Sequence, residues 1–175
     1  EPVLRKELLE RLEQDQAIRK ESIAATDERR RDEIFARMQT IDLSNTSRMK
    51  EIVAKYGWPS PKLVGRDGVQ AAFIIVQHAD FDFQKEVFPL VERAFKDGTI
   101  PGQSYALLLD RVLVRSGKPQ VYGTQAKVDG SKITLEPIDD EANVDRRRHE
   151  IGLPPISEYL KMLTAFYSPQ PNDNK

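Results

Sequence analysis

One histidine follows directly on an apolar segment of the chain. Six apolar residues, 71–76, lead without a break into Gln77, His78 and Asp80. An imidazole titrates near neutral pH and transfers protons as a general acid or base, and a neighbouring amide or carboxylate can orient its ring. A hydrogen-bonded network in the core would account for the same residues, because buried polar groups are normally paired. The segment therefore predicts either a catalytic site or a structural polar network at His78.

Polar side chains also interrupt the apolar faces of other predicted helices. Three leucines near the start of the chain continue at helical spacing into Asp15 and Arg19, with Gln16 beside them. An unpaired charge in the interior is costly, so inward polar groups should contact one another, a ligand or water. We predict one internal polar cluster that draws on four helices and contains Asp15, Arg19, Asn45, Arg48, His78 and Arg111.

The charges expected in this cluster favour a small anionic ligand. Three arginines would outnumber the inward carboxylates, and a phosphate or carboxylate would neutralise the excess positive charge. The first hypothesis is an enzyme, either a hydrolase, a transferase or a lyase, with His78 as general acid or base. We expect catalytic roles for His78, Asp15, Arg111 and Tyr122, and ligand binding by Gln16, Arg19, Asn45, Arg48, Trp58, Gln77, Asp80 and Gln125.

Two other hypotheses compete with the enzyme. The alternative is a non-catalytic binding or interaction module, secreted or periplasmic, in which the polar cluster is structural. A weaker third hypothesis, an effector or immunity-type protein, would have another protein as its partner, and the sequence does not indicate which. Pairs such as Asp15 and Arg19 are ordinary on helices, and Trp58 is more simply explained as an anchor beneath a proline-rich loop. The sequence leaves open whether the protein is an enzyme.

The composition narrows the class of protein. The 175 residues include 27 basic and 28 acidic side chains, and this balance argues against a nucleic-acid partner. No apolar run approaches the roughly 20 residues of a membrane-spanning helix. Cysteine is absent and only two histidines occur, which excludes thiolate catalysis, Cys-ligated zinc and a His-rich metal site. Because the sequence also lacks a phosphate-binding loop and a dinucleotide fingerprint, we expect neither a metal nor a cofactor.

Apolar periodicity predicts a mainly α fold, a compact multi-helix domain with one small hairpin. Segment 68–79 would also suit a strand, since it is rich in β-branched and aromatic residues, but its length favours a helix. Residues 57–68 contain prolines and glycines and are predicted to form a structured loop. Helices are expected over residues 2–22, 26–56, 68–79, 82–98 and 104–117, with two more after residue 143.

The one clear β signal lies at about residues 120–138. Within it, Asp129-Gly130 is a favoured pair for a two-residue hairpin turn. Pairing around that turn places Ala126 on the same face as Ile133.

We expect one globular domain over residues 1–167 and a disordered tail over residues 168–175. The chain begins with Glu1-Pro2 rather than Met, which fits a removed signal peptide and equally a cloned fragment. A secreted or periplasmic location is therefore favoured slightly over a cytoplasmic one.

Several short motifs follow one another along the chain. They are Gly57-Trp58-Pro59, Val64-Gly65 with Gly68, Gln77-His78-Ala79-Asp80, Asp110-Arg111-Val112, Tyr122-Gly123-Thr124-Gln125 and the segment 143–160. With these motifs, nearly the whole chain resembles a bacterial family known only as a domain of unknown function. Near the start of the chain, Asp15-Gln16 with Arg19, and Asp42 with Asn45 and Arg48, resemble the N-terminal motifs of that family. The resemblance implies no particular reaction, and it implies a signal peptide, which many members of the family carry.

Overall fold

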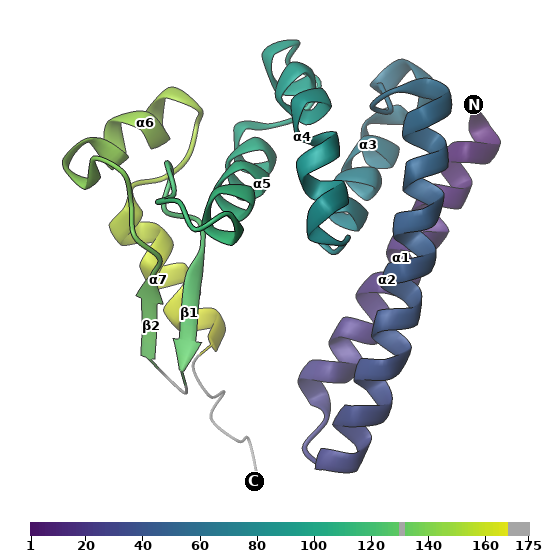
Figure 1. Cartoon of the computed structure of the whole chain (residues 1–175), viewed down its shortest axis with the longest axis horizontal. Helices are drawn as coiled ribbons and strands as arrows, with labels where there is room; N and C mark the ends of the chain where they lie inside the picture. The colour runs from purple at the N-terminus through teal and green to yellow at the C-terminus, as the bar shows by residue number, and fades with distance from the viewer. Residues whose placement is uncertain (130–131, 168–175) are drawn as a thin grey trace, which may run out of the picture. The chain divides into compact units, whose positions relative to one another are not determined.

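The computed structural model describes residues 1–129 and 132–167 (Figure 1). Within these residues it contains seven α-helices and one antiparallel pair of strands, which confirms the predicted mainly α fold with a small hairpin. Two compact units make up the chain, Glu1–Ile100 and Pro101–Lys175. The single domain expected over residues 1–167 stays a prediction, and the predicted tail lies outside the described residues.

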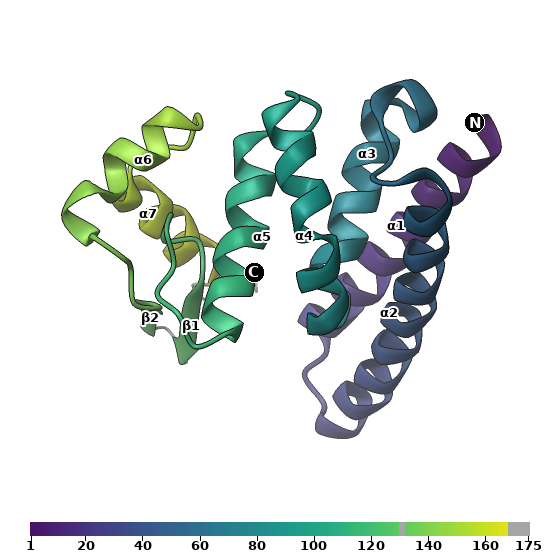
Figure 2. The same ribbon diagram turned by 45° about the horizontal axis from the view of Figure 1, so that its top comes forward.

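The first unit consists of four helices. α1 (Pro2–Ala24) and α2 (Glu28–Tyr56) form a long antiparallel hairpin, and α3 (Pro61–Gln77) packs against both of them (Figures 1 and 2). α4 (Phe81–Lys96) contacts α2 and α3. The apolar faces of the four helices meet in a core whose most buried members include Leu8, Ile52, Ile75 and Val87.

The ends of α2 follow from capping groups in the sequence. The Asp27 carboxylate accepts a hydrogen bond from the backbone N–H of Arg30 at 2.9 Å and so satisfies a donor of the first turn. At the other end Gly57 has φ +70°, a conformation that favours glycine. The predicted start near residue 26 and the predicted end at Tyr56 are therefore confirmed by one continuous helix.

The start of α3 differs from the prediction. A loop was predicted over residues 57–68, but the loop ends at Ser60 and α3 begins at Pro61. Proline is tolerated at the first helical position because its missing N–H would have no partner within the helix. Gly65, with φ +74°, then interrupts the helical geometry. The helix predicted over residues 68–79 is confirmed, and it ends at Gln77. Contacts with α1, α2 and α4 cover it on several sides, which explains its nearly continuous apolar run.

Two polar side chains connect α3 to α4. The Asp80 carboxylate caps α4 by accepting a hydrogen bond from the backbone N–H of Phe83 at 2.8 Å. The buried Gln84 amide donates to the backbone carbonyls of Val76 and Gln77 at 3.1 and 2.9 Å. These bonds satisfy carbonyls at the end of α3 that have no partner within that helix.

The second unit combines helices with the hairpin. Its elements are α5 (Gly102–Arg115), β1 (Ala126–Asp129), β2 (Lys132–Leu135), the 3-10 turn η1 (Glu141–Asn143), α6 (Val144–Glu150) and α7 (Ile156–Tyr167). α7 contacts both β2 and α6. No helix among the described residues of the chain is long and apolar enough to cross a membrane.

The hairpin has a register different from the predicted one. Asp129 pairs with Lys132, so residues 130 and 131 lie between the paired positions. In the predicted turn, Asp129 and Gly130 would both be unpaired and Ala126 would pair with Ile133. Ala126 pairs instead with Leu135, so the register is shifted by two residues. Side chains alternate with a period of two, so Ala126 and Ile133 keep the shared face that the sequence predicts. The turn itself lies outside the described residues.

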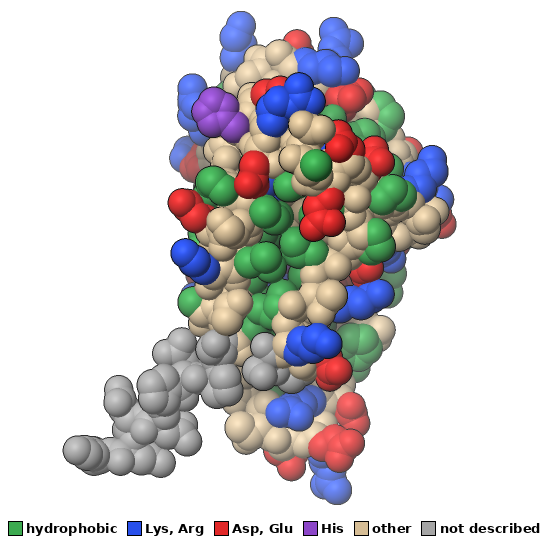
Figure 3. All heavy atoms as spheres, turned by 90° about the vertical axis from the view of Figure 1, so that its left-hand side faces the viewer, with side chains coloured by type: hydrophobic (Ala, Val, Ile, Leu, Met, Phe, Trp, Pro, Cys, Tyr) green, Lys and Arg blue, Asp and Glu red, His purple; other side chains and the backbone are tan. Residues whose placement is uncertain are grey.

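α7 carries apolar side chains that remain exposed. Met162 and Phe166, one turn apart, are 60% and 68% exposed, and α7 has no buried residue. Hydrophobic side chains gather in the middle of the face seen in Figure 3. α7 is therefore held in its unit by partly buried contacts rather than by a core of its own.

Substitution of Gly102 tests how closely α5 is packed within the second unit. In a helix, alanine is normally more stable than glycine by about 1 kcal/mol. A Cβ atom on Gly102, however, would overlap the backbone oxygen of Ile151 and lie 2.9 Å from the Ile151 Cβ. We expect Gly102→Ala to lower the free energy of unfolding by about 1–3 kcal/mol, measured by urea denaturation with far-UV circular dichroism. The control Gln103→Ala should change it by less than about 0.5 kcal/mol, and a more stable Gly102→Ala protein would contradict this packing.

Candidate functional site

Four polar side chains from three parts of the first unit meet at one point. Asp15 and Arg19 come from α1, Asp42 comes from α2, and His78 follows the last residue of α3. The His78 Nδ1 atom lies 2.9 Å from Asp15 Oδ1. Arg19 Nη2 donates to Asp15 Oδ1 at 3.1 Å and to Asp42 Oδ1 at 2.6 Å. These four residues, named here the His78 cluster, include three of the members predicted from the sequence.

Asp15 is the most buried member of the His78 cluster. Its side chain has no exposed surface, and its Oδ2 atom accepts a hydrogen bond from Gln16 Nε2 at 2.8 Å. Burial acts to raise the pKa of Asp15, but hydrogen bonds from His78 and Arg19 outweigh it and hold the pKa below its ordinary value. The carboxylate therefore stays ionised at neutral pH and depends on these donors.

The Nδ1 atom of His78 faces both a donor and an acceptor. Arg19 Nε lies 3.0 Å from it, but the same Nε lies 3.2 Å from Asp15 Oδ1 and can donate there instead. We therefore assign the proton of the neutral ring to Nδ1, which then donates to Asp15. In this tautomer the lone pair lies on the other ring nitrogen, Nε2, which makes no hydrogen bond to any residue that the structure describes. The side chain is 24% exposed, so solvent reaches the ring.

Asp42 is a member of the His78 cluster that was missing from the predicted site residues. Burial raises the pKa of Asp42, and the charge of Arg19 acts against that rise. Helical spacing was an available signal, since Met38, Asp42 and Asn45 share one face of α2. Met38 takes part as well, because its Sδ atom accepts a hydrogen bond from Arg19 Nη1 at 3.2 Å.

Asn45 and Arg48, two further predicted members, lie in a separate network around Glu7. Arg48 donates from Nε to Glu7 Oε1 at 2.7 Å and from Nη1 to Glu51 Oε2 at 2.6 Å. Arg11 links Glu7 to Asn45, whose Oδ1 accepts from Arg11 Nη1 at 3.1 Å. The hydrogen bonds from Arg48 hold the pKa of Glu7 below its ordinary value although burial opposes them. The charge of Arg48 is thus balanced within this Glu7 network.

Two other predicted residues of the first unit, Gln77 and Asp80, lie where α3 is followed by α4. Asp80, besides capping α4, forms an ion pair with Lys50 at 3.4 Å. Gln77 is buried at the end of α3. Ligand binding by either residue stays a prediction.

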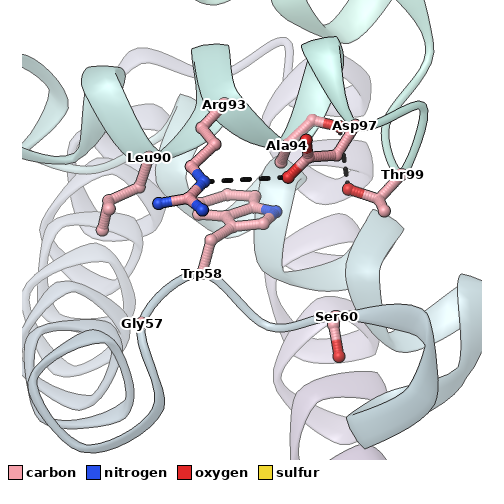
Figure 4. A pocket seen from close by; sticks show the side chains of 8 residues that line it. All are labelled: Gly57, Trp58, Ser60, Leu90, Arg93, Ala94, Asp97 and Thr99. Carbon is pink, nitrogen blue, oxygen red and sulfur yellow. Dashed lines mark hydrogen bonds and ion pairs between the residues drawn. The ribbon is translucent and has the colours of Figure 1, made fainter.

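Trp58 lines a cavity of about 270 Å³ in the first unit (Figure 4). Arg93 lies over the indole ring in this view, and its Nε atom is 3.8 Å from an oxygen of Asp97. The indole nitrogen is buried and has no hydrogen-bond partner among the described residues. Trp58 thus forms a wall of this cavity, and its expected role in ligand binding stays a prediction.

Asp110 holds the Tyr122–Gln125 motif in place in the second unit. Its carboxylate has no exposed surface and accepts hydrogen bonds from the backbone N–H groups of Val121, Tyr122 and Thr124 at 2.8, 3.1 and 3.0 Å. The Thr124 hydroxyl donates to it as well, at 3.0 Å. Burial raises the pKa of Asp110, and these hydrogen bonds act against the rise. Two motifs that are separate in the sequence therefore form one structural contact.

Arg148 is a buried charge that the sequence did not single out. It is 1% exposed and donates to the backbone carbonyls of Pro154 and Tyr122, each at 2.6 Å. Its Cζ atom lies 5.0 Å from the centre of the Tyr159 ring. Burial lowers the pKa of Arg148. Arg148 stands in a run of charged residues, 145–150, and the run contains no signal that one of its arginines turns inward.

Three predicted site residues belong to the second unit. Burial raises the pKa of Tyr122, whose ring centre lies 6.1 Å from that of Tyr105. Gln125 Nε2 donates to Thr124 Oγ1 at 3.0 Å, and Arg111 lies on α5. Participation of Arg111, Tyr122 and Gln125 in the site around His78 stays a prediction.

One comparison with known proteins gives a result. A model of a family of unknown function, DUF6624, matches residues 2–170. The chain belongs to this family. Neither a curated protein nor a solved structure matches the chain. In this member of DUF6624, several of the motif residues named from the sequence lie in three places: the His78 cluster, the Glu7 network and the contacts of the buried Asp110.

Replacement of Asp15 by asparagine tests the cluster as a source of stability. The pKa of Asp15 is lower in the folded protein than in the unfolded chain, where it is about 3.9. The ionised carboxylate therefore makes its full contribution to the free energy of unfolding above about pH 3.9, and this contribution is lost as the pH falls through the folded pKa. We expect Asp15→Asn to lower the free energy of unfolding by about 2–4 kcal/mol at pH 7, with a smaller difference from wild type below about pH 4. Urea unfolding followed by the fluorescence of Trp58, the single tryptophan, measures both values.

The matched control is Glu10→Gln. Glu10 also pairs at i,i+4 spacing on α1, with Lys6, but its side chain is 57% exposed, so water screens the pair. This substitution should leave stability nearly unchanged at either pH. Equal stability of Asp15→Asn and wild type at pH 7 would contradict the proposed role of the buried carboxylate.

Proposed function

We propose that the protein is an enzyme in which His78 transfers protons to and from a small anionic substrate, in a hydrolysis, a group transfer or an elimination. The observation that carries the proposal is the 2.9 Å contact between Asp15 and His78, together with a second ring nitrogen that no described residue engages. A carboxylate that orients an imidazole while its far nitrogen faces the reactants is the arrangement of a general base.

The proton would move as follows. The neutral ring donates from Nδ1 to Asp15, and its Nε2 lone pair accepts a proton from water or from a substrate hydroxyl. Asp15, with its depressed pKa, stays ionised and stabilises the imidazolium that forms. His78 also caps the C-terminal end of α3, where the helix dipole favours a positive charge. The proton then returns from Nε2 to the leaving group.

Arg19 is the residue of the cluster suited to an anion. Its Nε and Nη2 atoms are engaged by carboxylates, but Nη1 has only the Met38 sulfur, a weak acceptor, as a hydrogen-bond partner among the described residues. A phosphate or carboxylate oxygen would be a stronger acceptor at that position. The excess of positive charge expected from the sequence is not found in these four residues, which carry one net negative charge when His78 is neutral, so Arg19 Nη1 is the group that would bind the anion.

A second candidate function is a non-catalytic binding or interaction module, secreted or periplasmic, with a structural polar cluster. It is favoured by the pairing within the cluster: the Arg19 charge is shared between Asp15 and Asp42, and the buried Asp15 has donors on both oxygens. Such a cluster joins α1, α2 and α3 without a ligand.

His78→Ala tests the catalytic proposal against a panel of small phosphate and carboxylate esters. If the wild type turns over a member of the panel, we expect the variant to lose about 10²–10⁴-fold in rate, the usual contribution of a general acid or base. The control is His149→Ala, which replaces the other histidine of the chain and should keep the wild-type rate. Equal rates for His78→Ala and wild type would contradict the proposal.

Thermal unfolding of His78→Ala in phosphate-free buffer measures what the His78 ring contributes to the stability of the first unit. A purely structural ring should cost about 1–3 kcal/mol when removed, which lowers the melting temperature by several degrees. The catalytic candidate expects this loss as well, because its ring donates to the buried Asp15 in the same way, so only the rate of turnover distinguishes the two candidates.

A further inference from the structure

We propose that Asp15, Asp42 and His78 form a binding site for a divalent transition-metal ion, and that the Arg19 guanidinium occupies this site in the metal-free protein. The sequence predicted no metal, because it contains no cysteine and only two histidines. Bound metal would also block the proton transfer proposed for His78, and this regulatory part of the inference rests on the proposed function. The binding of the metal does not depend on it.

The geometry provides three ligand atoms. One atom each from Asp15, Asp42 and His78 lies within 4.8 Å of the other two, and the three side chains come from α1, α2 and the end of α3. Zinc bonds of about 2.0–2.2 Å in a tetrahedral site place its ligands about 3.4 Å apart. The separations in the structure thus exceed that spacing by about 1.4 Å at most.

Arg19 acts as a stand-in cation at this position. Its Nη2 atom contacts Asp15 Oδ1 and Asp42 Oδ1 at 3.1 and 2.6 Å, and its Nε lies 3.0 Å from His78 Nδ1. A positive group thus already binds the two candidate carboxylate oxygens and lies beside the candidate imidazole nitrogen, which an ordinary acidic surface patch does not provide. The Arg19 side chain is 24% exposed, and its long stem allows the charge to turn outward into water.

The donor set selects the class of metal. One imidazole nitrogen with two carboxylate oxygens suits zinc and its neighbours, whereas magnesium and calcium prefer oxygen ligands alone. Gln16, which donates to the second oxygen of Asp15 at 2.8 Å, would orient that ligand from outside the site. Three protein ligands leave one tetrahedral position for water or substrate.

Metal binding and the proposed proton transfer exclude each other. The His78 Nδ1 atom donates a proton to Asp15 in the metal-free protein, but it must present its lone pair to ligate a metal. Zinc would therefore displace Arg19 and hold the Nδ1 lone pair, and the ring proton would then lie on Nε2, which could no longer act as a base. The site therefore has two alternative states, one occupied by the Arg19 guanidinium and one occupied by the metal.

Isothermal titration of the metal-free full chain with zinc chloride, in phosphate-free buffer at pH 7.5, tests the inference. We expect one zinc per chain, with affinity reduced at least about 100-fold in His78→Ala and in Asp42→Asn. Arg19→Met, which keeps the length of the side chain without its charge, should bind zinc at least about 10-fold more tightly because the competing cation is gone. His149→Ala is the control and should bind like wild type.

Gain of affinity in Arg19→Met cannot arise from misfolding, so this variant keeps the test decisive. Absence of zinc binding in both wild type and Arg19→Met would overturn the inference, and so would weaker binding in Arg19→Met or loss of binding in His149→Ala. The visible absorption spectrum of the protein loaded with cobalt gives a second readout that needs no substrate. We expect this spectrum to differ between wild type and His78→Ala. Zinc binding without inhibition of turnover would refute only the regulatory part, and loss of turnover in His78→Ala without zinc binding would refute only the metal site.

Discussion

A charge removed from water needs hydrogen-bond donors at fixed positions, and the carboxylate of Asp15 imposes this condition on the first unit. Its donors come from its own helix, through Arg19 and Gln16, and from the end of α3, through His78. Because Arg19 also reaches Asp42, α2 is joined to the same point. The positions of α1, α2 and α3 at this level therefore depend on one buried carboxylate, and a change in any of its partners leaves a charge unsatisfied.

The second unit also contains a buried carboxylate, but its hydrogen-bond donors are of a different kind. Asp110 is as deeply buried as Asp15, but its donors are backbone N–H groups and one hydroxyl, none of which titrates near neutral pH. Arg148 likewise donates to backbone carbonyls. Such partners hold a loop in one shape and transfer no protons. Asp15 is paired instead with a partly exposed imidazole, and this difference is why proton chemistry is proposed at His78 rather than at Asp110.

Competition for a single atom links the two proposals. The Nδ1 atom of His78 lies within hydrogen-bonding distance of Asp15 and of Arg19, and it is also the candidate metal ligand. With a proton on Nδ1, the ring is held as a base. With a metal on Nδ1, the same ring becomes part of a closed site. Both states use side chains already gathered by the need to balance the charge of Asp15.

The sequence by itself determined the helices and part of the site. Apolar periodicity and capping residues such as Asp27 and Gly57 are local signals, so α2 could be predicted nearly to its ends, and the spacing of Asp15, Arg19 and His78 placed all three on inward faces. Only the tertiary structure decided which charges pair. Arg48 faces inward by the same periodicity, yet it binds Glu7 and Glu51, whereas Arg19 binds Asp42, a residue 23 positions away. Periodicity gives the direction of a side chain on its own helix, but ion pairing depends on which helix lies opposite, and that is set by the packing of the whole unit.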